Sequence, residues 1–130
     1  MGREMAKIGE LNKGSYVVYN GEPCRVTKKS VPSVKNKEDA KEKVYLEGLF
    51  DGQKRTFVEE PESRIEVPVI EKGKAQILAI VGNHAQLMDL SSYESFQLAI
   101  PLELRGEVEE GDEVEYIQAL GRKKIERKRS

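Results

Sequence analysis

Residues 15–28 read SYVVYNGEPCRVTK, and this stretch decides the fold class. Its first five residues are rich in the β-branched and aromatic side chains that favour strands. Asn20-Gly21 is the dipeptide that most strongly predicts a two-residue hairpin turn. After the turn, apolar and polar side chains alternate from residue 23 to residue 28, as in a strand with one buried face. The stretch therefore predicts an antiparallel hairpin.

Short strand patterns separated by turn residues continue along the rest of the chain. Further strands are predicted at residues 43–50, 55–58, 64–70, 75–81, 85–90, 93–100, 113–120 and 122–129. No long stretch has a helical period, and only residues 102–108 have room for a single helical turn. About ten strands in two sets indicate two small all-β barrels rather than a βαβ protein. We place the domain boundary at Ile70-Glu71, giving domains 1–70 and 71–130.

Composition narrows the class of protein. The chain has 130 residues, of which 38% are hydrophobic and 35% charged, with a net charge of -1. This balance argues against a strongly basic nucleic-acid binder but allows a locally basic face. A single cysteine permits no intrachain disulfide, the first ten residues are too polar for a signal peptide, and no apolar run could span a membrane. We expect a soluble, cytoplasmic monomer without a membrane partner.

The residue types needed for catalysis or metal binding do not form a set. His84 is the only histidine and follows the predicted turn at Gly82-Asn83, which favours a surface position. Cys24 lies in an amphipathic strand without a second histidine to activate it, which favours a buried, inert thiol. No glycine-rich phosphate loop precedes a helix. We therefore expect no enzymatic activity, no metal site and no cofactor.

A polar stretch at residues 29–43 stands between two predicted strands and would project as a long hairpin loop. Residues 28–43 contain six lysines and three acidic residues, a local charge of +3. One interpretation is a solvated loop. The other is a basic finger against phosphate, since lysine delivers a point charge on a flexible stem. The candidate RNA-binding residues in and beside this loop are Lys28, Lys29, Lys41 and Lys43.

A second basic run ends the chain. Residues 122–129 contain six basic side chains, although residues 71–130 as a whole carry nine basic and eleven acidic ones. The run is either a solvated tail or a basic stripe on a barrel that binds nucleic acid. Aromatic platforms are sparse in this half, which favours contacts to the RNA backbone over base reading. The candidate RNA-binding residues are Arg122, Lys123, Lys124, Arg127 and Lys128.

Several segments together resemble a known family. The chain contains Gly-Glu-Pro-Cys-Arg-Val at 21–26, Gly-Leu-Phe-Asp-Gly at 48–52, Val-Pro-Val-Ile at 67–70 and Gln-Leu-Met-Asp-Leu-Ser-Ser-Tyr-Glu-Ser-Phe at 86–96. In this order they resemble the archaeal and eukaryotic initiation factor 5A family, in the elongation factor P superfamily. The resemblance implies an SH3-like (KOW-type) barrel followed by an OB-fold. It also implies binding to the large ribosomal subunit and tRNA.

The resemblance fails at the tip of the first domain's loop. Family members carry a lysine there that deoxyhypusine synthase converts to hypusine, in the pattern Ser-Lys-x-Gly-Lys-His-Gly-x-Ala-Lys. Aligned on Ala40-Lys41, this chain has Lys35, Asn36 and Lys37 at the tip, with Asn36 in place of the modified lysine. An amide cannot accept the aminobutyl group, so deoxyhypusine synthase is a doubtful partner. Either the chain is an unmodified paralogue, which we favour, or Lys35 or Lys37 is modified instead.

Three functions follow from these observations. The leading one is a translation factor of the initiation factor 5A type that assists elongation and peptide-bond formation. The alternative is an RNA-binding module acting away from the ribosome in RNA metabolism. A structural protein that has kept the fold and lost RNA binding is the third, and both basic segments argue against it.

Overall fold

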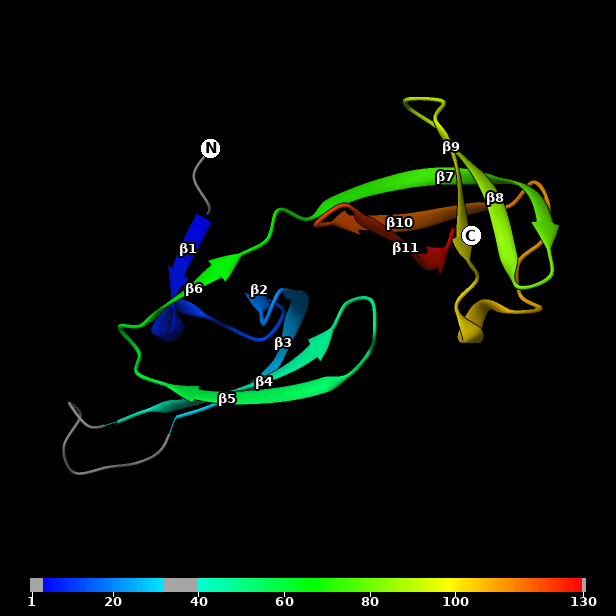
Figure 1. Cartoon of the computed structure of the whole chain (residues 1–130). Helices are drawn as coiled ribbons and strands as arrows, with labels where there is room; N and C mark the ends of the chain where they lie inside the picture. Colours follow the sequence, from blue (N-terminus) through cyan, green and yellow to red (C-terminus); the bar gives the residue numbers. More distant parts are fainter. Residues whose placement is uncertain (1–3, 32–39, 130) are drawn as a thin grey trace. The chain divides into compact units, whose positions relative to one another are not determined.

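The computed structural model describes residues 4–31 and 40–129, which form two compact units (Figure 1). The units are Met1–Pro68 and Val69–Ser130, so they divide two residues before the boundary expected from the sequence. Each described unit consists of antiparallel strands and a single three-residue 3-10 helix. The first unit is an SH3-like barrel and the second an OB-fold, as the resemblance implies.

The first unit packs two sheets around one core. A four-stranded sheet has the order β2-β3-β4-β5, and β1 pairs with β6 in a two-stranded sheet. The strands are β1 (Glu4–Lys7), β2 (Tyr16–Tyr19), β3 (Glu22–Ser30), β4 (Glu42–Gly48), β5 (Lys54–Glu59) and β6 (Arg64–Val67), with the 3-10 helix η1 (Ile8–Glu10) after β1. The turn predicted between β2 and β3 is confirmed, since Asn20 and Gly21 both have positive φ, at 52° and 78°.

Alternation along β3 and β4 builds the core of this unit. Side chains on one face of each strand are buried, and those on the other face are exposed or half-buried, apart from Pro23, which is buried as well. The buried set is Ile8, Leu11, Val17, Cys24, Val26, Val44 and Leu46. Cys24 is therefore a buried thiol, as expected, and burial raises its pKa. Tyr19 stacks on Phe57 beside this core, with ring centroids 5.2 Å apart.

β1 was not predicted from the sequence. This strand is four residues long, only two of them are apolar, and only its last two residues are half-buried. Two half-buried positions are too few to show an alternating pattern, so only its pairing with β6 identifies it as a strand.

The second unit is one five-stranded sheet with the order β11-β10-β7-β8-β9. Its edge strands, β9 and β11, contact one another, which curls the sheet into a barrel. The strands are β7 (Glu71–Val81), β8 (His84–Asp89), β9 (Ser95–Ala99), β10 (Glu113–Ala119) and β11 (Arg122–Lys128). The expected helical turn is present as η3 (Leu102–Leu104). None of the helices in the described ranges is long and apolar enough to cross a membrane.

The starts of two strands in the second unit differ from those predicted from the sequence. His84 is exposed, as expected, but it is the first residue of β8 and pairs with Val81 rather than lying in the turn. β7 begins at Glu71 and includes Gly73, where a Cβ atom would lie 2.6 Å from the Tyr116 ring. The glycine is required here because the Tyr116 side chain lies across the strand at that point.

Candidate nucleic-acid interface

The predicted basic loop is shorter than the sequence suggested. β3 continues to Ser30 and β4 begins at Glu42, so Lys29 and Lys43 lie in strands and not in a loop over 29–43. The ladder extends because Lys29 pairs with Val44 and Ser30 with Lys43. The three predicted tip residues, Lys35, Asn36 and Lys37, lie outside the described residues.

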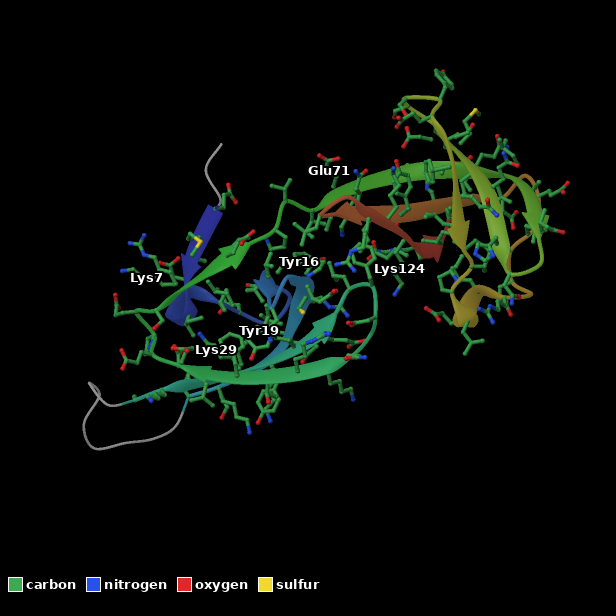
Figure 2. The ribbon with its side chains drawn as sticks, in the orientation of Figure 1. Lys7, Tyr16, Tyr19, Lys29, Glu71 and Lys124 are labelled. Atoms are coloured by element: carbon green, nitrogen blue, oxygen red, sulfur yellow. The ribbon has the colours of Figure 1, made fainter. Side chains whose placement is uncertain are left out.

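Lys29 is bound within the protein. Its Nζ is 3.0 Å from Glu42 Oε1 and donates hydrogen bonds to the backbone oxygens of Ile8 at 3.5 Å and Gly9 at 3.1 Å (Figure 2). The Lys29 side chain is 15% exposed and that of Glu42 7%. This ion pair joins β3, β4 and η1. The geometry favours a structural role for Lys29 over the RNA contact predicted from its charge.

Glu42 depends strongly on this pair. Its Oε2 has no hydrogen-bond partner among the residues that the structure describes, so the Lys29 ammonium is the main compensation for its burial. A Cβ atom on the adjacent Gly9 would lie 3.3 Å from Pro61 Cβ and 3.6 Å from Glu42 Oε2, so the site has little spare room. We conclude that Lys29, Glu42 and η1 form one packed assembly.

Lys28 and Lys43 converge on an aromatic ring that the sequence analysis did not single out. A bulge between Val26 and Lys28 turns Lys28 outward, while Lys29 turns toward the core side. Lys28 then pairs with Tyr45 across the strands, and Lys43 lies two residues before Tyr45 on the same face of β4. The Lys28 and Lys43 Nζ atoms are 5.3 Å and 5.2 Å from the centroid of the ring. Both ammonium groups are within cation–π range.

Lys41 is the third exposed lysine among the described residues of the hairpin. It directly precedes β4. Of the four lysines predicted here, Lys28, Lys41 and Lys43 are exposed, and Lys29 is held by Glu42. The structure therefore presents three cations at the described end of the β3–β4 hairpin.

The basic run on β11 is largely neutralised by the second unit itself. Arg127 Nε is 2.7 Å from Glu115 Oε2, and Arg129 Nη1 is 2.9 Å from Glu113 Oε1. Lys128 Nζ is 3.4 Å from Asp112 Oδ2 and donates a hydrogen bond to the Glu107 backbone oxygen at 3.1 Å. The basic side chains predicted as a stripe do lie along β11 or directly after it, but carboxylates on β10 and in the turn before it form ion pairs with three of them.

The other residues of this run lie earlier on β11, and each has an interaction of its own. Lys123 Nζ lies 4.9 Å from the centroid of the Phe96 ring. Arg122 and Lys124 lie on the same strand and also have partners. The candidate RNA-binding residues of this run therefore all lie on β11, but each of them already has an interaction within the protein.

The aromatic residues of the second unit serve mainly as core. Phe96 and Tyr116 pack edge to face at 4.9 Å, and Tyr116 is 8% exposed. The Tyr116 hydroxyl donates a 2.5 Å hydrogen bond to Asp89 Oδ2, and Asp89 Oδ1 accepts from the backbone N–H groups of Ser91 and Ser92. Burial and this bond raise the pKa of Tyr116 to about 12, and the same bond lowers the pKa of Asp89. Of the three aromatic residues of the second unit, Tyr93, Phe96 and Tyr116, Tyr93 is the one that is largely exposed, at 72%.

Metal-ligand clusters are absent from the described ranges, where no group of three His, Cys, Asp or Glu side chains could hold an ion. The chemistry available at the hairpin is therefore that of cations and one aromatic ring. Such a surface suits phosphate and bases. Tyr45 was missed, although Lys43 and Tyr45 share the period-2 spacing that places them on one face; the bulge that adds Lys28 leaves no sequence signal.

Comparison with known proteins identifies the family. The family model described as "Eukaryotic elongation factor 5A hypusine, DNA-binding OB fold" matches residues 69–129. Translation initiation factor 5A of Archaeoglobus fulgidus is 42% identical over 125 residues, covering 96% of this chain and 98% of its own. The same-named protein of Methanothermobacter thermautotrophicus is 42% identical over 127 residues, covering 98% of each chain.

Solved structures agree with the sequence comparison. Eukaryotic translation initiation factor 5A from Methanococcus jannaschii superposes with a TM-score of 0.89 at 41% identity, covering 98% of this chain and 96% of its own. A family protein from Naegleria fowleri has a TM-score of 0.76 at 22% identity over 98% of this chain and 99% of its own, which supports the fold alone. With this similarity over nearly its whole length, the chain belongs to the initiation factor 5A family of translation factors, which are not enzymes.

Proposed function

We propose that this translation factor acts in the cytoplasm by binding the large ribosomal subunit and tRNA, and that it assists peptide-bond formation during elongation. The observation that carries the proposal is the cationic end of the β3–β4 hairpin. Lys28, Lys41 and Lys43 are exposed there, next to a stem fixed by the Lys29–Glu42 ion pair. A fixed stem holds the exposed cations near one another, as binding to closely spaced phosphates requires.

We further propose that the chain acts without hypusine. Asn36 occupies the position of the modified lysine, and its amide has no amine to which an aminobutyl group could be transferred. Intact-mass measurement of protein purified from its native source tests this proposal. We expect the mass of the unmodified sequence, and an added mass mapping to Lys35 or Lys37 would overturn it.

Ribosome binding is tested by sedimenting cell extract through a sucrose gradient at low salt. We expect the chain in the large-subunit fractions and its release as salt rises, because phosphate contacts weaken with ionic strength. Replacing Lys28, Lys41 and Lys43 together by alanine is expected to remove most of the bound fraction. Arg127→Ala is the matched control, since this exposed cation is already paired with Glu115.

The outcome of the gradient also separates the two RNA-binding functions. If the wild-type chain is absent from the large-subunit fractions, the proposal is wrong. Retention of binding to purified RNA in that case would favour the alternative, an RNA-binding module that acts away from the ribosome.

A further inference from the structure

Two hollows of the first unit share lining residues of β3. One, of about 510 Å³, is lined by residues that include Lys13, Thr27 and Lys28. The other, of about 320 Å³, includes Thr27, Lys28, Tyr45 and Lys54. Thr27 and Lys28 line both hollows, so the two adjoin at β3, and we call them together the Tyr45 groove. Each hollow falls within the range of about 300–1,000 Å³ typical of ligand pockets.

The charge of the Tyr45 groove is predominantly positive. Lys13, Lys28 and Lys54 are exposed along it, and among the residues that the structure describes Glu47 is the one acidic residue of its lining. Neither Lys13 nor Lys54 forms an ion pair with any residue in the described part of the chain. The groove therefore favours a ligand that carries several negative charges.

Tyr45 gives the groove an aromatic wall. The ring is half-buried, and the Thr27 hydroxyl donates a 3.2 Å hydrogen bond to the Tyr45 backbone oxygen, which joins β3 to β4 beside the ring. Lys28 and Lys43 are exposed, and a cation–π contact at an exposed site contributes only about 0.5–1 kcal/mol. A nucleobase stacked on a protein aromatic ring contributes about 1–3 kcal/mol. A base can therefore displace one ammonium group from Tyr45, and the displaced lysine then becomes available to a phosphate.

We propose that the Tyr45 groove binds a short segment of single-stranded RNA, with one base stacked on Tyr45 and flanking phosphates on Lys13, Lys28 and Lys54. The combination distinguishes RNA from an acidic peptide, because a peptide would use the lysines but would have no base for the ring. This inference rests on the proposed function in one respect, that the chain binds RNA. It adds a site at Tyr45 on β4 that includes none of the tip residues 35–37.

The test measures binding of a fluorescent oligouridylate of about ten nucleotides, a length within the range of known single-strand sites. Tyr45→Ala is expected to weaken binding about tenfold, as loss of one stacked base predicts. Tyr45→Phe keeps the ring and should bind within about twofold of wild type. Tyr93→Ala is the matched control, since Tyr93 is an exposed tyrosine of the second unit. An unchanged affinity for Tyr45→Ala would overturn the proposal.

A second measurement uses only the wild-type chain and so does not depend on how the variants fold. An abasic oligonucleotide of the same length keeps the phosphates and removes the bases, so we expect it to bind about tenfold more weakly than oligouridylate. If the abasic oligonucleotide or a polyglutamate peptide bound as tightly as oligouridylate, base stacking on Tyr45 would be ruled out. The sucrose gradient distinguishes failure of this proposal from failure of the proposed function. If the wild-type chain sediments with the large subunit but Tyr45→Ala binds oligouridylate as tightly as wild type, only the proposal of RNA binding in the Tyr45 groove is wrong.

Discussion

The β3–β4 hairpin and β11 are both rich in basic residues, but they place their charges differently. On the hairpin, Lys28 and Lys43 lie against a tyrosine ring, and one carboxylate, Glu42, is buried with Lys29. On β11, Arg127 lies beside a carboxylate of the neighbouring strand, and Lys128 beside one in the turn before it. Residues 28–43 and residues 122–129 each contain six basic residues, in sixteen and eight positions respectively. The segment with the denser basic sequence therefore has the charges that are better compensated by carboxylates in the structure.

This difference separates two uses of an ion pair. The Lys29–Glu42 pair is almost fully enclosed, so the Glu42 carboxylate depends on Lys29 for compensation. The Arg127 side chain is 60% exposed, so water screens its pair with Glu115. Burial, rather than the number of charges, decides which pair stabilises the fold. The predictions below test that distinction.

The largest effect is expected at the buried pair. Lys29→Met keeps the length of the side chain but leaves the Glu42 carboxylate buried without a cation. Breaking a buried pair in this way costs about 3–5 kcal/mol, and the partial exposure of Lys29 favours the lower value. Urea denaturation should show a loss of about 3 kcal/mol in the unfolding free energy of the first unit.

The adjacent lysine provides the control. Lys28→Met changes an exposed residue of the same strand and should alter stability by less than about 0.5 kcal/mol. The double change Lys29→Met with Glu42→Met removes both charges and should recover most of the loss. Equal stability of Lys29→Met and Lys28→Met would show that the buried pair is not structural.

The second unit has a buried polar pair of its own, with a smaller expected effect. Tyr116→Phe removes the hydrogen bond to Asp89, but the N–H groups of Ser91 and Ser92 still compensate the carboxylate. A hydrogen bond to a charged group contributes about 1.5–3 kcal/mol. We expect a loss of about 2 kcal/mol near neutral pH, measured by thermal or urea unfolding.

The pH dependence of Tyr116→Phe gives a second check. The folded-state pKa of Asp89 is lowered from 3.8, so this stabilisation is present above that pH and is lost as the pH falls below it. The pKa of Tyr116 is raised from 10.0 to about 12, so the stabilisation is also lost as the pH rises through that interval. The difference between wild type and variant should therefore shrink at both extremes, and a constant difference would rule out the bond as its source.

RNA binding tests the contrast between the two basic segments directly. Lys28→Ala with Lys43→Ala is expected to weaken binding of single-stranded RNA about tenfold and to reduce its log–log salt slope by about 1.4, or about 0.7 for each lost phosphate contact. Arg127→Ala with Lys128→Ala should weaken binding less than about threefold, because those cations already have acidic partners. A larger loss from the β11 variant would reverse the comparison.

Much of the fold was predictable because local patterns set it. Asn20-Gly21 formed the expected turn, and alternation located the strands on either side of it. The predicted end of β3, at residue 28, was wrong because Lys29 and Ser30 have no apolar side chain that would extend the alternating pattern. Their pairing depends on Val44 and Lys43, which are distant in sequence. Strand ends set by cross-strand pairing are not visible in one segment.

The candidate site was less predictable for the same reason. Lysine content identified Lys28 and Lys43, but it gave no means to separate them from Lys29. That separation comes from the bulge after Val26, which reverses the faces of the next two residues. Tyr45 entered the site only when β3 and β4 were paired. Long-range register, rather than composition, decides which of these residues share a surface.

The smallest expected effect is at the exposed pair between Arg127 and Glu115. A double-mutant cycle with Arg127→Ala and Glu115→Ala should give a coupling energy of about 0.2–1 kcal/mol, because exposed pairs are screened by water and salt. The coupling should fall further in about 1 M salt, where the screening length is about 3 Å. The same cycle at Lys29 and Glu42 should give at least about 2 kcal/mol and depend little on salt. Similar couplings at the two sites would mean that burial does not distinguish them, and the contrast between the hairpin and β11 would then have to rest on RNA binding alone.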